Sequence, residues 1–267
     1  MQDNPKLSPL VRVFAAVVIL VLAGGVLLLL YPALISHRWP WRLTPFNARF
    51  LGAFYTAELA AILMLGVINR WSPGRLILIM AVSFTALVSI VSLWHLDRFD
   101  FGRKGPWGWF FVYVGSALVA AAFVWTHRAL EHPGRPLASP ASRLFFIAQA
   151  VAIGGYGLAL LVAPQWAAGF WPWRVDVFHA QVYSAIFITA GLGAYLLARA
   201  ASSYELVAFG LAQMILGAAA ILGLWLANLE RPALAWTAPA TMVWIAMFAA
   251  LGVVGAVNLA LARRTAD

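Results

Sequence analysis

One acidic residue, Glu58, lies deep inside a long apolar stretch of the sequence, and its surroundings are the best candidates for chemistry. Apolar stretches of this length usually cross bilayers, and a charge near the bilayer centre costs about 3 kcal/mol or more. Tyr55 precedes Glu58 by one helical turn, and Thr85 and Ser89 share a face of the next stretch. The grouping predicts an intramembrane proton or cation site. The alternative is a neutral Glu58 that only hydrogen-bonds to a hydroxyl group within the packing.

A second set of candidates is a repeated loop motif, in which the sequence Trp-Pro-Trp-Arg occurs twice at an offset of 132 residues. Its residues are Trp39, Pro40, Trp41 and Arg42, and then Trp171, Pro172, Trp173 and Arg174. Indole rings favour the headgroup level of a membrane, where arginine meets lipid phosphate or stacks on tryptophan. We therefore expect interfacial anchors. The alternative is a pair of lids over a central vestibule, which Arg49 would favour; Arg49 lies nine residues before Glu58, on the opposite side of an ideal helix.

A metal site is the third possibility, because Asp176 and His179 are three residues apart and His95 is expected at the same end of the protein. Imidazole and carboxylate groups bind several divalent metals. The spacing matches no known metal motif, and the chain has no cysteine. The sequence therefore predicts no metal site, no catalytic residue and no cofactor.

The composition indicates the elements that must position these residues. Of 267 residues, 64% are hydrophobic and only 10% are charged, against about 25% charged in ordinary soluble domains. A water-soluble globule of this size cannot hide so much apolar surface. This excludes a soluble enzyme, a disordered chain and a nucleic-acid-binding domain, despite the net charge of +9. The predicted fold class is all-α, a polytopic integral membrane protein.

Eight stretches are long and apolar enough to form transmembrane helices. They are 13–36, 50–69, 76–96, 105–126, 144–173, 177–198, 206–229 and 232–262. An even number of crossings puts both termini on one side. That side would carry ten of the basic residues and the other side eight, which favours cytoplasmic termini. Heavy use of arginine and alanine suggests a bacterial protein, and thus the inner membrane.

Internal similarity divides the eight spans into two sets of four. Residues 39–54 and 171–186 share seven identities in sixteen positions. We predict two tandem four-helix repeats, residues 1–135 and 136–267. An even number of spans per repeat gives both the same orientation, related by a pseudo-twofold axis along the membrane normal. Both Trp-Pro-Trp-Arg loops should then lie on one face, taken as the outer one.

Each half resembles the DoxX-like four-helix membrane units, whose first helix ends in a segment of small residues and proline, as in residues 157–164. Residues 39–53 are also similar to uncharacterised bacterial multi-pass membrane proteins with a W-P-W-x-L-T-P motif. The resemblance covers the first two helices of each half and implies a fold but no activity. The second copy departs from it with Asp176 for Thr44, Val177 for Pro45 and Gln181 for Arg49.

Three classes of function fit these observations. The first is a small-solute or proton-coupled transporter or channel, with a path at the repeat interface and Glu58 as its ionisable group. The second is a non-catalytic accessory or scaffold subunit of a larger membrane complex. The third is a membrane enzyme with an outer-face His/Asp site. The scarcity of polar residues in the spans argues against charged or large polar solutes. Expected partners are membrane lipids, including anionic headgroups, and other membrane subunits, but not nucleic acid.

Overall fold

The protein is described by a computed structural model that covers residues 4–130, 134–135, 137 and 139–266. Within this part of the chain, eight helices are long and apolar enough to cross a membrane. They are α1 (Pro9–Leu30), α3 (Pro45–Ile68), α4 (Trp71–Trp94), α5 (Lys104–Thr126), α6 (Pro140–Val162), α8 (Val177–Arg199), α9 (Ser203–Glu230) and α10 (Pro239–Ala266). The predicted all-α fold with eight spans is confirmed, and the chain is a multi-pass membrane protein.

The first span of each half is shorter than predicted, because a proline interrupts it. Pro32 begins the short helix α2 (Pro32–Ile35), and Pro164 begins α7 (Pro164–Ala167). Proline has no backbone N–H to donate and clashes with the preceding turn. The predicted stretches 13–36 and 144–173 are therefore each a membrane helix followed by a separate short helix. The helical turns η1 (Ser36–Arg38) and η2 (Leu96–Arg98) lie in loops at the same end.

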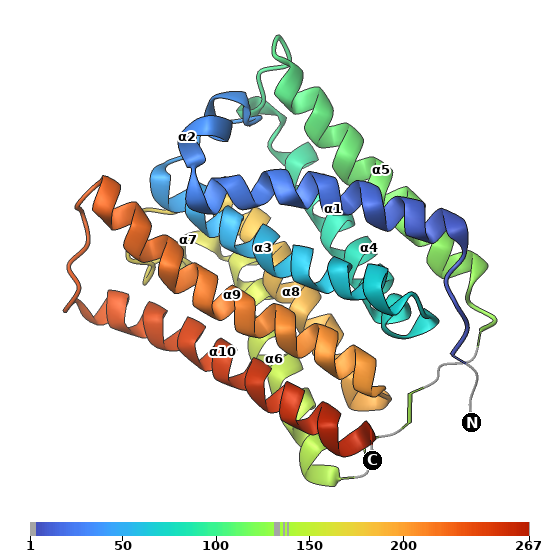
Figure 1. Ribbon diagram of the computed structural model, residues 1–267. Helices are drawn as coiled ribbons and strands as arrows, with labels where there is room; N and C mark the ends of the chain where they lie inside the picture. The colour runs from blue at the N-terminus through green and yellow to red at the C-terminus, as the bar shows by residue number, and fades with distance from the viewer. Residues whose placement is uncertain (1–3, 131–133, 136, 138, 267) are drawn as a thin grey trace.

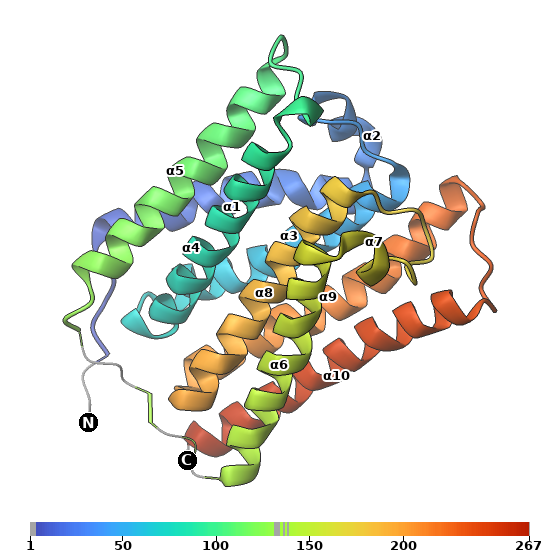
Figure 2. The same ribbon diagram turned by 180° about the vertical axis from the view of Figure 1, so that it is seen from behind.

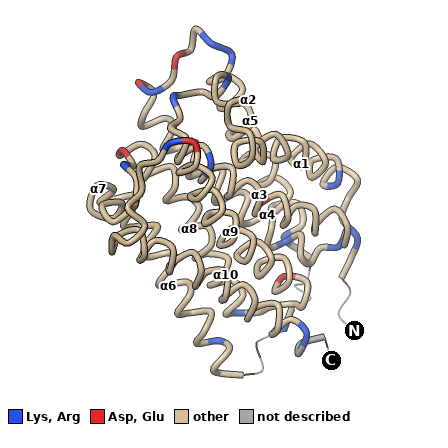
Figure 3. The backbone as a smooth tube through the Cα atoms, turned by 60° about the vertical axis from the view of Figure 1, so that its left-hand side comes forward, with Lys and Arg blue, Asp and Glu red and all other residues tan. Residues whose placement is uncertain are grey.

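Four helices form the centre of the bundle and four lie outside them. The central helix α3 packs against α9, and α4 packs against α8, so the two halves meet through these two pairs. On the outside, α1 covers α3, α5 covers α4, α6 covers α8 and α10 covers α9. Figures 1 and 2 show this arrangement, with both ends of the chain at the same end of the bundle. Charged positions gather at helix ends and in loops (Figure 3).

Matched contacts join the halves at the end where the termini lie. The hydroxyl group of Ser72, the second residue of α4, bonds to that of Ser202, the N-cap residue of α9. The segment before each half's first helix also pairs with the loop before its third, through two isolated backbone bridges, Lys6 to Arg70 and Arg135 to Ala201. A tandem repeat would produce such pairs. The division between residues 135 and 136 stays a prediction, and residue 136 lies outside the described residues, as do residues 1–3 and 267.

Candidate functional site

The two Trp-Pro-Trp-Arg loops lie together at the other end of the bundle, where they exchange hydrogen bonds. Trp41 donates its indole N–H to His179 Nε2 at 3.0 Å, and Trp173 donates to Asn47 Oδ1 at 2.8 Å. Positions 47 and 179 are 132 residues apart, which is the offset between the two motifs. Each loop therefore closes over the first turn of the opposite half's second helix.

The structure differs from the expected interfacial anchors at the indoles. Trp41 and Trp171 are only 6% and 5% exposed, because they pack into the end of the bundle. The two arginines of the motif, Arg42 and Arg174, remain exposed, as a contact with lipid headgroups would require. Trp41 and Trp173 thus bind the two halves together, and Arg42 and Arg174 are free to face a membrane surface.

A polar contact between the two halves occurs twice at this end, and we call each copy a polar clamp. Buried Arg49 donates to the Leu29 carbonyl and pairs with Glu230 at the end of α9. The matching residue Gln181 donates to the Leu161 carbonyl at 2.8 Å, and its Oε1 lies 2.6 Å from His95 Nε2 at the end of α4. Arg49 is therefore committed to a bond between the halves. As the helical spacing predicted, it does not pair with Glu58.

The candidate metal ligands are used in the same contacts. Asp176 caps α8 and binds the His179 backbone and its Nδ1, both at 2.9 Å, while Trp41 bonds to the other ring nitrogen. Partial burial works to raise the pKa of Asp176, but hydrogen bonds from His179 and the nearby Arg98 charge lower it to about 2. His95 faces Gln181 instead. The described residues hold no group of three or more side chains arranged to bind a metal.

The main cavity has a volume of about 610 Å³ and lies within the first half, between α1, α3, α4 and α5. It continues past Phe187 of α8 as far as Gln213 of α9, so its inner end reaches the interface between the halves. Its walls are largely apolar. This size and character are typical of sites that take small molecules. Glu58 lines it, from the middle of α3.

Three of the four predicted intramembrane site residues, Glu58, Tyr55 and Thr85, line this cavity together. The Tyr55 hydroxyl lies 2.7 Å from that of Tyr113 on α5. Thr85 and the fourth residue, Ser89, donate to carbonyls of their own helix, at 2.6 and 2.7 Å. None of the described residues forms a hydrogen bond or ion pair with the Glu58 carboxyl group. The structure therefore differs from the alternative in which a hydroxyl group satisfies Glu58.

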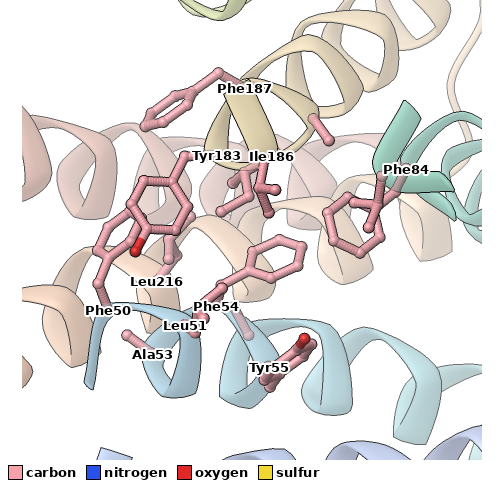
Figure 4. Close-up of a cluster of buried hydrophobic side chains, with 14 of the residues drawn as sticks. Phe50, Leu51, Ala53, Phe54, Tyr55, Phe84, Tyr183, Ile186, Phe187 and Leu216 are labelled. Carbon is pink, nitrogen blue, oxygen red and sulfur yellow. The ribbon is translucent and has the colours of Figure 1, made fainter. Parts of the chain in front are cut away.

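Aromatic side chains in the cavity wall near Glu58 form a closed circle of contacts, which we call the aromatic ring. Six residues take part, each in contact with the next at centroid distances of 4.1–6.1 Å: Trp39, Trp109, Tyr113, Phe84, Phe54 and Tyr55. Figure 4 shows Phe54 of α3 turned toward Phe84 of α4. Phe54, Phe84 and Trp109 were not among the site residues predicted from the sequence. The four-residue spacing of Trp109 and Tyr113 was a signal for a shared helix face, but it did not indicate which helices face each other.

A second polar group lies beyond the cavity's inner end. Gln213, which lines the cavity, donates to Gln149 Oε1 at 3.2 Å and accepts from Asn258 Nδ2 at 2.7 Å. All three amides are at least 94% buried. Buried amide groups that bond to one another across three helices, here α6, α9 and α10, fix the packing of those helices. We assign this group to the structure of the second half.

The arrangement can hold a largely apolar guest beside one titratable carboxyl group. No such guest can be inferred from relatives, because no known protein family, curated protein or solved structure matches this chain.

Proposed function

We propose that the protein is a proton-coupled carrier of a small, mainly apolar molecule, with Glu58 as the group that takes up and releases the proton. The observation that carries this proposal is the Glu58 carboxyl group, to which no described residue bonds, in a large apolar cavity within the membrane-spanning bundle. A polar group in such a place costs free energy, and residues of this kind are usually functional. In the second half, Ala190 occupies the position that matches Glu58, so one half alone carries the ionisable group.

A carrier is favoured over an open channel, because side chains fill both ends of the first half. At the loop end, Trp39, Trp41 and Trp109 contact one another at centroid distances of 4.7–5.7 Å. At the end with the termini, Trp71 stacks on His127 at 5.4 Å. The cavity reaches the interface between the halves but lies mainly in the first half. We therefore place the binding site off the predicted pseudo-twofold axis, rather than along it.

Charge displacement in a supported membrane tests the proton site without any knowledge of the solute. A pH jump applied to proteoliposomes should move charge as protons reach Glu58, and Glu58→Gln should abolish this signal. Asp97→Asn is the control, because Asp97 is an exposed carboxylate in a loop. A signal that survives Glu58→Gln would contradict the proposal. If wild-type protein gives no signal and co-purifies with other subunits in mild detergent, the accessory-subunit function replaces it.

We further propose that the protein lies in a bacterial cytoplasmic membrane with both termini inside. The excess of basic residues on the side of the termini supports this orientation. The exposed Arg42 and Arg174 would then meet anionic lipid headgroups at the outer surface. The chain has no cysteine, so single cysteines can be introduced directly. A membrane-impermeant maleimide should label Arg42→Cys in whole cells but not Lys6→Cys; the opposite pattern would reverse the orientation.

A further inference from the structure

We infer that the molecule bound in this cavity is a lipophilic organic cation that arrives from the bilayer through an opening between α1 and α5. The inference rests on the proposed role of Glu58 as a proton site and adds the chemical class of the ligand. A bulky apolar cation differs from the hydrophilic charged solutes that the scarcity of polar residues argues against. Its charge is spread over an apolar body, and one carboxylate is enough to balance it.

The charges around the cavity favour a cation at its centre. Of the residues that line the described cavity, four can carry a charge: Glu58, Tyr55, Tyr113 and Arg38. The two tyrosines bond to each other and are neutral hydrogen-bonding groups at physiological pH. Arg38 lies in η1 at the loop end and is exposed, so water and headgroups solvate it. Among the described residues that line the cavity, Glu58 is therefore the one charge-bearing group in its middle, and none of them supplies a counter-ion to its ionised form.

The aromatic ring beside Glu58 supplies the second half of the recognition. Tryptophan, tyrosine and phenylalanine rings attract cations through their negative faces, most strongly where water is excluded. All six side chains of the ring line the cavity, and Tyr55 is one helical turn from Glu58. A carboxylate next to several aromatic faces fits an organic cation better than it fits a neutral apolar molecule or an anion.

The opening lies between the middle parts of α1 and α5. These helices touch near the end with the termini, where the Phe14 and Phe123 rings are 5.8 Å apart, and they diverge from there (Figures 1 and 2). At the loop end, Gly105 closes the gap against the Arg38 carbonyl. Between these contacts, four side chains line the cavity and are also 40–82% exposed: Val17, Val21, Phe111 and Val119.

Small residues keep this opening wide. A Cβ atom added at Gly108 or Gly115 would meet nothing within 4 Å. Both glycines line the cavity, on α5. Because the exposed residues beside them belong to a membrane-spanning segment, the opening faces lipid. A lipophilic cation, which concentrates in the bilayer, can reach Glu58 this way without passing Arg38.

Binding would exchange one cation for one proton. The neutral carboxyl group of Glu58 releases its proton to water, and the carboxylate that forms pairs with the incoming cation. The reverse exchange releases the cation. The net charge of the cavity is the same before and after, so neither state leaves an unpaired charge in the membrane interior.

Binding of tetraphenylphosphonium to the full-length protein in lipid nanodiscs tests the inference, with tetraphenylborate as an anion of similar shape. Equilibrium dialysis of the radiolabelled cation should show one saturable site per chain. Where proton and cation compete for one carboxylate, each unit of acidification should weaken binding by up to about tenfold. Glu58→Gln should weaken it by about 30-fold, as expected for the loss of one partner of a desolvated charge pair. Tetraphenylborate should not compete.

Two leucine substitutions test the route. Gly108→Leu should slow association of tetraphenylphosphonium by about tenfold or more, because its side chain would project into the opening. The matched control is Gly155→Leu on α6, which is also exposed and has open space around it. It should bind like wild type. Equal association rates in both variants would remove the lateral route.

The outcomes separate this inference from the proposed function. If the pH jump moves charge through Glu58 but tetraphenylphosphonium does not bind, or tetraphenylborate competes equally well, the protein is a proton-coupled carrier and the cation inference is wrong. If tetraphenylphosphonium binds through Glu58 but no charge moves, the site holds cations without proton coupling. Unchanged affinity in a folded Glu58→Gln variant overturns the inference directly.

Discussion

The two halves of the molecule share one set of aromatic contacts at the loop end. They differ in whether the side chains beside these contacts surround a cavity. In the first half, Trp109 and Tyr113 lie 4.1 Å apart and face the cavity; in the second, Trp244 and Phe248 lie 4.3 Å apart in the same relation to the loop tryptophans. The first half places Tyr55, Glu58 and Tyr113 around open space. The matching residues in the second half are Phe187, Ala190 and Phe248. This set of contacts is thus shared, and the titratable side chains that line the cavity all belong to the first half.

One side chain of the first half fills part of the second half, and the second half has no matching side chain that does the same in return. Phe50 of the first half reaches across into the second, where it contacts Trp171, Tyr183 and Phe248 at 4.8–5.6 Å. Val182 is the matching residue in the second half, and it is too short to reach as far in the opposite direction. Phenylalanine buries far more area than valine and can fill the space between other rings. The first half receives no such ring in return, and we predict that a phenylalanine at position 182 would reduce its cavity.

Glycine contacts close the second half further. Gly191 and Gly154 bring α8 and α6 so close that a Cβ atom at Gly191 would lie 2.5 Å from the Gly154 Cα. Gly255 is in the same situation against the Gly210 carbonyl oxygen, also at 2.5 Å. Small residues allow such backbone approach between membrane helices. The first half has Leu22 and Leu59 at the positions that match Gly154 and Gly191. The first half has a close approach at another position, where Gly52 of α3 meets the Leu29 backbone of α1.

The largest effect should come from filling one of these glycine contacts. Gly191→Leu would place a side chain against backbone atoms that cannot move aside, so we expect little folded protein and a loss of more than about 3 kcal/mol. Gly155→Leu on α6 is the control, since nothing lies within 4 Å of its Cβ position. The yield of monodisperse protein and the thermal unfolding midpoint in detergent measure both. Similar stability of the two variants would show that the close packing does not hold this half together.

Substitutions at Phe50 and its matching residue Val182 should have the next largest effect. Phe50→Val empties the second half's ring cluster and should cost about 2 kcal/mol, a large-to-small change in a core. Val182→Phe should instead fill the first half, since by symmetry its ring points toward Trp39, Trp109 and Tyr113. It should abolish tetraphenylphosphonium binding and keep the protein folded. Unfolding by denaturant and equilibrium dialysis distinguish these effects. Undiminished binding in Val182→Phe would show that a ring at position 182 does not fill the cavity.

Much of the fold, and little of the site's geometry, was predictable from the sequence. Apolar length is set by bilayer thickness, so all eight spans could be counted. Glu58 could be singled out because a charge within such a span is rare. The aromatic ring could not be predicted, because Phe54, Phe84 and Trp109 lie on three different helices. How these helices are rotated relative to one another depends on their packing, which the sequence does not show. Likewise, the buried position of the loop tryptophans could not be predicted, because the indole partners of Trp41 and Trp173 lie in the opposite half.

The polar clamps offer a smaller and more selective test. Glu230→His alone leaves buried Arg49 without its carboxylate and should cost about 2 kcal/mol; the cost is below that of a fully buried pair because the Glu230 side chain is 45% exposed. Arg49→Gln combined with Glu230→His copies the Gln181–His95 clamp of the other half. The double variant should regain about 1 kcal/mol or more of this loss. Additive losses in a double-mutant cycle would mean that the two clamps are not interchangeable.

The smallest effect should follow from replacing the cap of α8 with that of α3. Thr44 and Asp176 occupy matching positions, and each accepts a hydrogen bond from the backbone three residues later, at 3.2 and 2.9 Å. Both residue types cap helices well, but Asp176→Thr also loses the carboxylate bonded to the His179 ring, so it should cost about 1 kcal/mol at neutral pH. The pKa of Asp176 is lowered from 3.8 to about 2 in the folded protein. Its ionised form therefore stabilises the fold above about pH 4, and this advantage disappears as the pH falls toward 2.

The difference between wild type and Asp176→Thr should accordingly be largest at pH 5–7 and shrink in acid. Thermal unfolding midpoints from pH 3 to pH 7 would measure it. Thr44→Asp is the converse variant: it lacks a histidine at position 47, where the chain has Asn47, so it should gain no comparable advantage. A pH-independent difference for Asp176→Thr would show that the bond to His179 contributes nothing beyond the cap. The helix caps of the two halves would then be equivalent in energy as well as in geometry.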